Sequence, residues 1–230
     1  MASYEYYKKI IGDLPVIGNF LKWLYLRLSI FRKFPGSASY WESRYQEGGN
    51  SGAGSYNFLA EFKAEILNAF VQENKVQTII EFGCGDGNQL KLAQYPKYIG
   101  FDISPSAISM CRELFKNDKN KNFKVLSDYS NEKAELVLSL DVIYHLVEDE
   151  VFEQYIRNIF NASDKYVIIY SSDVDLPREF HVRHRKFSKW IEEHIPEWNL
   201  EEHIPNRYPY HGNHWKGSLA DFFIYKKRKK

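Results

Sequence analysis

Three glycines follow an apolar run in this 230-residue chain, and their spacing could shape a ligand-binding turn. Gly83, Gly85 and Gly87 are spaced G-x-G-x-G directly after residues 78–82, and a helix-permissive stretch, 88–92, follows them. Glycine tolerates positive φ and lets the backbone approach a bound molecule closely, while the amides of a following helix point into the same space. The pattern predicts a strand, a tight turn and a helix that together hold a nucleoside-type ligand.

Two carboxylates beside this turn narrow the choice of ligand. Asp102 lies nineteen residues after Gly83 and closes a second apolar segment, 98–101, at a spacing that suits a ribose diol. Glu81 stands just ahead of the turn, where it would repel a phosphate and suit a cationic or amino-bearing group. The G-x-G-x-G spacing also differs from the G-x-G-x-x-G that a dinucleotide pyrophosphate prefers. We therefore expect a nucleoside that carries an amino group.

The surrounding sequence predicts the elements that position these residues. Strands are predicted at 78–82, 98–101, 123–126, 134–140, 165–170, 200–204 and 219–225. Helices are predicted at 57–71, 104–116, 148–160 and 188–194. Four strand–helix units in succession predict a parallel sheet with helices on both faces and right-handed crossovers. The last two strands are expected to form an antiparallel pair at the sheet edge, because a loop rich in proline, glycine and histidine joins them.

The first 55 residues are predicted to be distinct from a domain at 56–230. Residues 1–34 mix apolar and basic side chains. This pattern fits a helix packed on the domain or on a partner subunit, and it also fits peripheral contact with an anionic membrane surface. Residues 39–56 hold four glycines within seven positions, 48–54, and are bounded by aromatic residues. We expect a flexible loop that closes over a ligand, and a plain surface linker is the alternative.

Composition argues against several classes of protein. The net charge of +1 argues against a nucleic-acid partner, since basic patches dominate such binding. Cys84 and Cys111 provide neither a disulfide framework nor a metal-ligand spacing, which fits a reducing cytoplasm. No secretory signal is visible, and charges interrupt the apolar stretches short of the roughly 18 to 20 residues of a membrane span. We expect a cytoplasmic protein, with membrane contact only through residues 1–34.

Taken in order, the polar ends of four strands resemble the motifs of the class I S-adenosylmethionine-dependent methyltransferases. The resemblance rests on residues 81–87, Asp102, Asp128 and 141–146, and it covers roughly residues 56–225. It implies a Rossmann-like, doubly wound α/β fold with a mostly parallel seven-stranded sheet and an antiparallel edge strand. It also implies S-adenosyl-L-methionine as the cofactor. The glycine turn would face the methionine part, Asp102 would hold both ribose hydroxyls, and Asp128 would accept from the adenine amino group.

The same resemblance assigns further residues to the cofactor. Ile103 would pack on the adenine, and Leu140 with Asp141 would lie under the methionyl end. A Tyr-Trp-Glu-x-Arg-Tyr run at 40–45 is similar to the amino-terminal segment that covers the cofactor in several members of the family. The expected cofactor-binding residues are Tyr40, Arg44, Tyr45, Glu81, Gly83, Cys84, Gly85, Gly87, Asp102, Ile103, Ser104, Asp128, Tyr129, Leu140 and Asp141.

Side chains before and after the core motifs could meet a methyl acceptor. A hydroxyl acceptor usually needs a general base, which a histidine can provide near neutral pH, whereas an amine needs only its neutral form. Arginine and lysine could clamp a phosphate or a carboxylate. We expect catalytic roles for Tyr144, His145, His181 and His184. The expected acceptor contacts are Tyr56, Tyr144, His145, His181, Arg183, His184, Arg185 and Lys186.

The sequence is compatible with more than one acceptor. The glycine-rich aromatic segment and residues 141–146 look like those of small methyltransferases that accompany bacterial surface-polysaccharide synthesis. That resemblance implies methylation of a hydroxyl on a sugar or a phosphorylated metabolite. A small amine, such as an amino-alcohol phosphate, is the second hypothesis, and a non-catalytic nucleoside-binding scaffold is the third. The absence of a proline–aromatic motif at 141–144 disfavours nucleic-acid amino groups as acceptors.

Two further features also have a purely structural interpretation, and the number of subunits stays open. The basic cluster at 181–187 is equally compatible with a solvated face of the domain. His145 alone is as compatible with a structural histidine as with one that faces the acceptor. A homodimer is a further possibility that the sequence does not decide.

Overall fold

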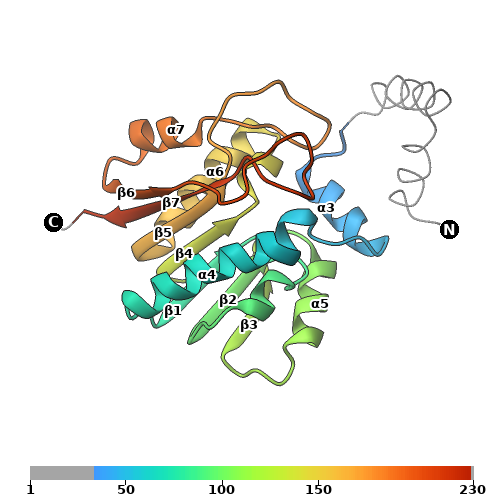
Figure 1. The fold of residues 1–230 in the computed structure, drawn as a ribbon. Coiled ribbons are helices and arrows are strands. Elements are labelled where there is room, and N and C mark those ends of the chain that lie inside the picture. Colours follow the sequence, from blue (N-terminus) through green and yellow to red (C-terminus); the bar gives the residue numbers. More distant parts are fainter. Residues whose placement is uncertain (1–33, 229–230) are drawn as a thin grey trace. The chain divides into compact units, whose positions relative to one another are not determined.

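The computed structural model describes residues 34–228 of the chain (Figure 1). Contacts group Gly36–Lys230 into one compact unit and Met1–Pro35 into another. The predicted amphipathic segment, 1–34, lies outside the described residues except for its last position. Its membrane or subunit contacts and the domain division at residue 55 therefore stay predictions.

Seven strands form one sheet in the order β3-β2-β1-β4-β5-β7-β6. The strands are β1 (Thr78–Phe82), β2 (Lys97–Asp102), β3 (Lys121–Val125), β4 (Ala134–Leu140), β5 (Ser163–Ser171), β6 (Trp198–Ile204) and β7 (Asp221–Lys227). Strands β1 to β5 are parallel, and β7 runs antiparallel to both β5 and β6. This confirms the predicted mostly parallel sheet with an antiparallel pair at its edge. The strand order reverses at β1, which pairs with both β2 and β4, and ligands of such sheets bind at that reversal.

Helices cover both faces of the sheet (Figure 1). Residues of α4 (Asn57–Glu73) and α5 (Pro105–Leu114) join one apolar cluster, and residues of α6 (Asp149–Asn161) and α7 (Phe187–His194) join the other. Successive side chains of a strand enter opposite clusters, as Ile79 and Ile80 do. Burial on both faces explains why β4 is almost continuously apolar in sequence. The expected Rossmann-like, doubly wound architecture is confirmed.

The segment before α4 is more ordered than its glycine content predicts. Residues Ser37–Gln46 form a helix, α3, although a loop was expected to begin at residue 39. The glycines begin only at Gly48, so the preceding residues carry no helix-breaking side chain. The glycine-containing part is therefore limited to residues 48–54, which end in a 3-10 helix, η1 (Ala53–Ser55).

One expected α-helix is absent, and one further strand connection contains no α-helix. The glycine turn leads into a four-residue 3-10 helix, η2 (Gln89–Leu92), instead of the expected α-helix. The connection from β3 to β4 contains only another 3-10 helix, η3 (Leu126–Asp128). The first difference has a simple cause, since β2 already begins at Lys97 and the turn uses much of the chain between the two strands.

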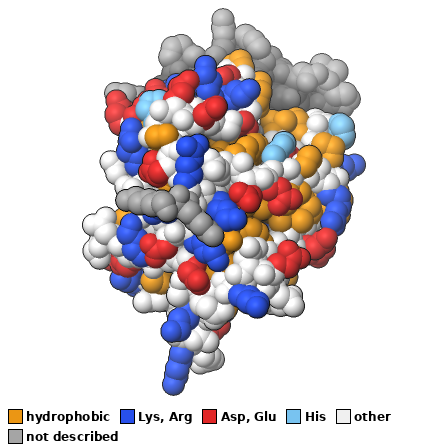
Figure 2. All heavy atoms as spheres, turned by 90° about the vertical axis from the view of Figure 1, so that its left-hand side faces the viewer, with side chains coloured by type: hydrophobic (Ala, Val, Ile, Leu, Met, Phe, Trp, Pro, Cys, Tyr) orange, Lys and Arg blue, Asp and Glu red, His pale blue; other side chains and the backbone are white. Residues whose placement is uncertain are grey.

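Charged side chains of both signs are interspersed on the face shown in Figure 2, with hydrophobic side chains between them. That face carries no extended area of a single charge, in keeping with the net charge of +1. Within residues 34–228, no helix has the combination of length and apolar character that crossing a membrane requires.

Candidate functional site

The glycine turn connects β1 to η2 with its backbone in conformations that favour glycine. Gly83, Gly85 and Gly87 have φ values of 86°, 57° and 77°. The amides of Gly83 and Cys84 both donate to the carbonyl of Phe101, at 2.6 and 3.0 Å, so the turn folds over the end of β2. A Cβ atom on Gly83 would lie 2.3 Å from Cγ2 of Val142, which follows β4. The turn thus packs against the ends of both neighbouring strands with no room for a side chain.

Asp102 lies at the end of β2 with its carboxylate beneath the turn. One oxygen accepts from the amide of Gly85 and the other from the amide of Ser104, both at 2.9 Å. Burial raises the pKa of Asp102 to about 6. Ser104 in turn caps α5, since its hydroxyl accepts from the amide of Ala107 at 3.0 Å. The carboxylate expected to hold a ribose is therefore close to the glycine turn and partly engaged by backbone amides.

The side chains expected around an adenine lie at the ends of β2 and β3. Ile103, next to Asp102, is 40% exposed and is available for contact with a flat apolar ligand. Asp128 is exposed on η3. The ring of Tyr129 packs edge-on against Phe82 and Phe101, and its buried hydroxyl has no hydrogen-bond partner among the described residues. An orphaned hydroxyl here is compatible with a ligand contact.

Residues 48–54 lie directly on the glycine turn. The amide of Ser51 donates to Asp86 at 2.9 Å, and the hydroxyl of Tyr56 donates to the same carboxylate oxygen at 2.8 Å. Tyr45 Oη lies 3.0 Å from Ser51 Oγ. A Cβ on Gly85 would lie 2.3 Å from Ser51 Oγ, so the loop occupies the space above the turn. A ligand that approaches Gly85 must therefore displace this loop, which we call the covering loop.

Sequence reasoning missed Asp86 and Ser51, the two residues that hold the covering loop. It did select Tyr45 and Tyr56, and the structure brings both to this contact. Arg44 also supports the loop, since its Nε donates to the carbonyl of Asn50 at 2.7 Å. The small polar residues of the loop could have indicated these contacts, because such side chains often form hydrogen bonds with nearby backbone amides.

Asp141, the first residue after β4, forms a buried ion pair that the sequence did not reveal. Its backbone is left-handed, with a φ of 60°. Lys63 Nζ of α4 lies 2.5 Å from Asp141 Oδ2, and the hydroxyl of Tyr144 donates to Oδ1 at 2.8 Å. A Cβ on Gly54 would lie 2.7 Å from Oδ2, so the covering loop reaches this carboxylate as well. The signal for Lys63 was its position within the apolar stripe of α4, four residues from Leu59.

A second group of rings surrounds His145 at the end of η4 (Ile143–His145). Its ring is stacked over that of His181, 5.5 Å between centroids, and the edge of Trp41 lies 4.8 Å from it. Burial, with His181 nearby, lowers the pKa of His145 to about 3. Tyr40 stacks on His181 at 4.6 Å, which places it with the histidines and not at the glycine turn.

His184 lies on the other side of Tyr144, with 5.6 Å between the two ring centroids. Its Nδ1 is 2.5 Å from the hydroxyl of Ser172, and burial lowers its pKa. Both His145 and His184 are therefore neutral at physiological pH. A neutral imidazole can accept a proton, and the lower the pKa, the weaker the base.

The basic residues expected to clamp an anion have other partners in the structure. Arg183 and Arg185 each donate to Asp149 at 3.0 Å. Arg185 also donates to the carbonyls of residues 146 and 147, at 2.6 and 2.9 Å, and lies over the ring of Phe152. Lys186 is exposed just before α7. An anionic acceptor would have to compete with Asp149 for the two guanidinium groups.

Glu81, the acidic residue before the turn, is buried and accepts from the hydroxyl of Tyr98 at 2.6 Å. Burial raises its pKa from 4.5 to about 7. Between about pH 4.5 and 7, Glu81 is therefore protonated in the folded protein and ionised in the unfolded chain. Stability from this group is present at low pH and is lost as the pH rises through about 7.

We predict that Glu81→Gln removes this pH dependence. As the pH rises from 5 to 8, the unmodified protein should lose about 2–3 kcal/mol of unfolding free energy as Glu81 ionises. The variant should not show this loss, because glutamine stays neutral. Urea unfolding at the two pH values measures the difference, with Glu61→Gln on the exposed side of α4 as the matched control. A difference that is the same at pH 5 and pH 8 would contradict the prediction.

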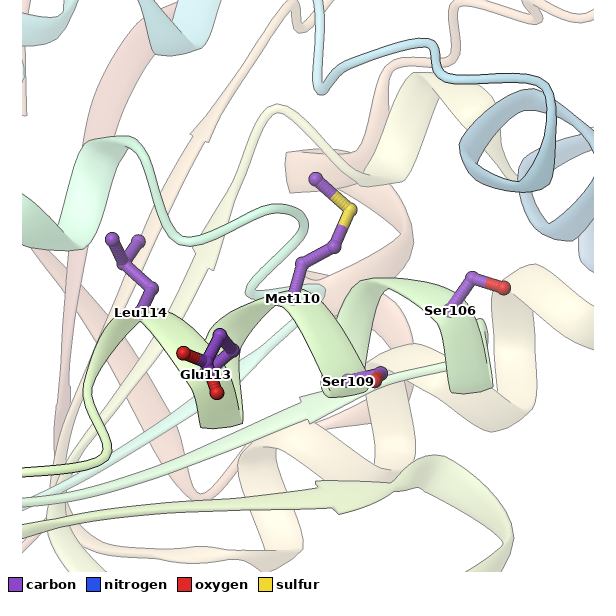
Figure 3. Close-up of a pocket in the computed structure, with 5 residues that line it drawn as sticks. All are labelled: Ser106, Ser109, Met110, Glu113 and Leu114. Atoms are coloured by element: carbon purple, nitrogen blue, oxygen red, sulfur yellow. The ribbon is translucent and has the colours of Figure 1, made fainter.

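Two surface hollows of the molecule lie away from these residues. One, of about 560 Å³, is lined by five residues of α5, whose side chains Figure 3 labels. A second, of about 270 Å³, is lined by residues of β1 to β4 that include Thr78 and Lys97. Neither includes a residue of the predicted site.

Comparison with known proteins identifies the family. Residues 55–214 match the model of a family described as a methyltransferase domain. The chain belongs to this methyltransferase family. The match includes the glycine turn, Asp102 and the segment around Asp141, which are the residues that the structure assembles at the reversal of strand order. The expected membership among methyltransferases is confirmed.

Solved methyltransferase structures share the fold at low sequence identity. The N-methyltransferase NodS from Bradyrhizobium japonicum, in complex with S-adenosylhomocysteine, has a TM-score of 0.60 and 17% identity, covering 75% of this chain and 88% of NodS. Magnesium protoporphyrin IX methyltransferase from Synechocystis, with bound S-adenosylmethionine, has a TM-score of 0.60 and 14% identity, covering 84% and 97%. The methyltransferase domain of a bacterial Hen1 has a TM-score of 0.54 and 16% identity, covering 72% and 96%.

A curated relative comes from Arabidopsis thaliana. Its small RNA 2'-O-methyltransferase is 29% identical over 112 residues, covering 41% of this chain and 12% of that protein. The matched part is thus a small fraction of the plant protein. These similar proteins differ in the kind of acceptor that their names state, so the comparisons establish the fold and the family.

Proposed function

We propose that this protein transfers a methyl group from S-adenosyl-L-methionine to a small polar acceptor. The observation that carries the proposal is the arrangement at the reversal of strand order. Asp102 lies beneath the glycine turn, and the Asp141–Tyr144 pair follows the strand on its other side. Val142 contacts Gly83, so a nucleoside at the turn and an acceptor beside Tyr144 would be neighbours.

The residues present fit the cofactor. The carboxylate of Asp102 suits the two ribose hydroxyls, and exposed Ile103 suits the face of the adenine. Asp128 on η3 has no ion pair within residues 34–228 and can accept from an amino group, and Tyr129 supplies the orphaned hydroxyl nearby. When bound, S-adenosylmethionine supplies an electrophilic methyl group on a sulfonium. The protein's part is then to hold donor and acceptor in line and to keep water out, which the covering loop would do.

We propose a hydroxyl of a sugar-like molecule as the acceptor, in line with the resemblance to enzymes of surface-polysaccharide synthesis. Its proton needs a base, and the neutral imidazole of His184 is the stronger candidate, because the pKa of His145 is lowered to about 3. Since Arg183 and Arg185 already bind Asp149, we favour an uncharged acceptor over an anionic one. Tyr144 and the rings around His145 would provide flat surfaces for the sugar.

Methylation of a small amine is the second candidate, and one observation favours it. The carboxylate of Asp141, although already paired with Lys63, is hydrogen-bonded to Tyr144 beside the proposed acceptor, and an amine can donate to a carboxylate oxygen. Such an acceptor would lose its proton before transfer and would need no strong base.

Incubation of the full chain with methyl-labelled S-adenosylmethionine and a panel of acceptors tests the proposal. The panel pairs free sugars with sugar phosphates and nucleotide sugars, and adds amino-alcohol phosphates and a short RNA. We expect label on a sugar oxygen, located by mass spectrometry, with at most a few-fold preference for the phosphorylated partner of each pair. Label on nitrogen would support the amine, label on the RNA would contradict a small acceptor, and cofactor binding without any transfer would favour the scaffold hypothesis.

A further inference from the structure

Lys63 is the most deeply buried charged side chain of the described residues, with a side chain only 1% exposed. It projects from the apolar stripe of α4, between Leu59 and Leu67, which are both buried. A methionine or leucine would pack there without the large desolvation penalty of an ammonium group. The lysine is therefore a poor choice for packing alone, and its charge needs a reason beyond holding α4 on the sheet.

The ammonium group of Lys63 has one hydrogen-bonded partner among the contacts of the described residues, Asp141 Oδ2 at 2.5 Å. It also lies 5.1 Å from the centre of the Tyr170 ring, an arrangement that favours a cation. Asp141 begins the segment after β4 in a left-handed conformation. The pair thus ties α4 to the end of the strand where the methyl acceptor is proposed to bind.

Through Asp141, the charge of Lys63 reaches two parts of the site. The second oxygen of Asp141 accepts from the hydroxyl of Tyr144 at 2.8 Å, which fixes the phenol ring beside His145 and His184. Gly54 of the covering loop packs against the first oxygen. Removing the ammonium group would release both contacts at once.

Other titratable groups around this pair do not supply a replacement cation. Burial and the charge of Asp141 raise the pKa of Tyr144, so its phenol stays protonated and donates. Burial likewise raises the pKa of Tyr170 on β5. Glu81 of β1 is close enough for Lys63 to lower its pKa against the effect of burial. Lys63 thus pairs with Asp141, lies over the ring of Tyr170 and lowers the pKa of Glu81.

We propose that Lys63 is a positioning residue of the methyltransferase site, which holds the Asp141 carboxylate as an anion and so places Tyr144 and the covering loop. It acts through Asp141 and touches neither the cofactor nor the acceptor. The inference rests on the proposed function, because it assigns to Asp141 an ionised role at the methionyl end of the cofactor. S-adenosylhomocysteine carries that end and its ammonium group, so it is a suitable probe.

The test measures the affinity for S-adenosylhomocysteine by calorimetry between pH 6.5 and 8.5 in four proteins. These are the unmodified full chain, Lys63→Met, Lys63→Met/Asp141→Asn and the control Lys189→Met at an exposed position of α7. Asparagine tolerates the left-handed backbone, so the double variant replaces the ion pair without new strain. A lone buried carboxylate takes up a proton readily, so Lys63→Met should bind about as well as the double variant at pH 6.5 and more tightly at pH 8.5.

We expect the affinity of Lys63→Met, divided by that of the unmodified protein, to rise about tenfold from pH 6.5 to pH 8.5. Using the ratio cancels ionisations common to both proteins, such as that of Asp102, and the double variant, which also lacks Lys63, controls for the effect of Lys63 on the pKa of Glu81. The double variant should recover thermal stability yet bind at least tenfold more weakly than the unmodified protein at every pH. Lys189→Met should match the unmodified protein.

Three outcomes would overturn the inference. The first is a Lys63→Met ratio that does not depend on pH. The second is a double variant that recovers affinity together with stability, because the ion pair would then have only a structural role. This outcome can be measured even if Lys63→Met does not fold. The third is an unmodified protein that binds no S-adenosylhomocysteine, which contradicts the proposed function itself and is distinguishable from the other two.

Discussion

Replacing Asp102 with alanine is expected to weaken the binding of S-adenosylmethionine at least about 100-fold. The carboxylate is the proposed acceptor for both ribose hydroxyls, and hydrogen bonds to a charged group contribute about 1.5–3 kcal/mol each. It also accepts from the amides of Gly85 and Ser104, and alanine would leave both without this partner. The variant therefore loses a ligand contact and the order of the turn together.

Equilibrium binding measures this effect, with Asp164→Ala as the control because Asp164 is exposed near the start of β5. The same titration has a predicted pH dependence. Since burial raises the pKa of Asp102 to about 6, the affinity of the unmodified protein should fall as the pH drops through that value. Binding by Asp102→Ala within a few-fold of the unmodified protein would remove Asp102 from the cofactor site.

Gly83→Ala is expected to be the most damaging single change in the glycine turn. Alanine at a φ of 86° is strained, at a cost of about 1–3 kcal/mol, and its Cβ would lie 2.3 Å from Cγ2 of Val142. The clash forces the turn away from β4, which should add a further loss of about 1–3 kcal/mol and abolish measurable cofactor binding. Denaturant unfolding and equilibrium binding on the same samples report the two effects.

The chain provides a matched control for the backbone strain. Gly212 has a φ of 87°, and a Cβ there would meet no atom within 4 Å. Gly212→Ala should therefore show the strain without the clash and keep cofactor binding intact. The double variant Gly83→Ala/Val142→Ala should recover part of the lost stability, because it removes the contacting methyl group. If Gly83→Ala and Gly212→Ala lose equal stability, the clash has no role.

The covering loop gives the proposed activity an order of events. Ser51 rests over Gly85, where the cofactor is proposed to approach, and Asp86 holds it there through backbone and side-chain hydrogen bonds. The cofactor must therefore enter before the loop reaches a closed position above it. Residues between Gly48 and Gly54 can make this movement because glycine supplies the necessary backbone freedom.

Much of the fold follows from patterns that act locally. Period-two and continuous apolar runs predict the strands, and Ser104 with Pro105 predicts the start of α5, which the structure confirms with a capping bond to Ala107. The main failure arises from contacts between segments that are distant in the sequence. Helical order in α3 depends on contacts such as Glu42, which accepts from the hydroxyls of Ser104 and Ser106 far along the chain. No local pattern reveals such a partner.

The sequence by itself determined which residues gather at one edge of the sheet. Asp102 and Asp141 follow parallel strands, and the carboxyl ends of parallel strands meet at the same edge whatever the details of packing. It also determined the glycine turn, because three glycines at that spacing need backbone conformations that other residues resist.

Only the tertiary structure decided which groups these residues bind. Arg183 and Arg185 were expected to face an acceptor, and the structure pairs them with Asp149. Lys63 was one position in an apolar stripe, and the structure joins it to Asp141, 78 residues further along the chain. The physical reason is that a long charged side chain can reach several partners, and the choice among them depends on desolvation and geometry that arise only when the helices dock on the sheet.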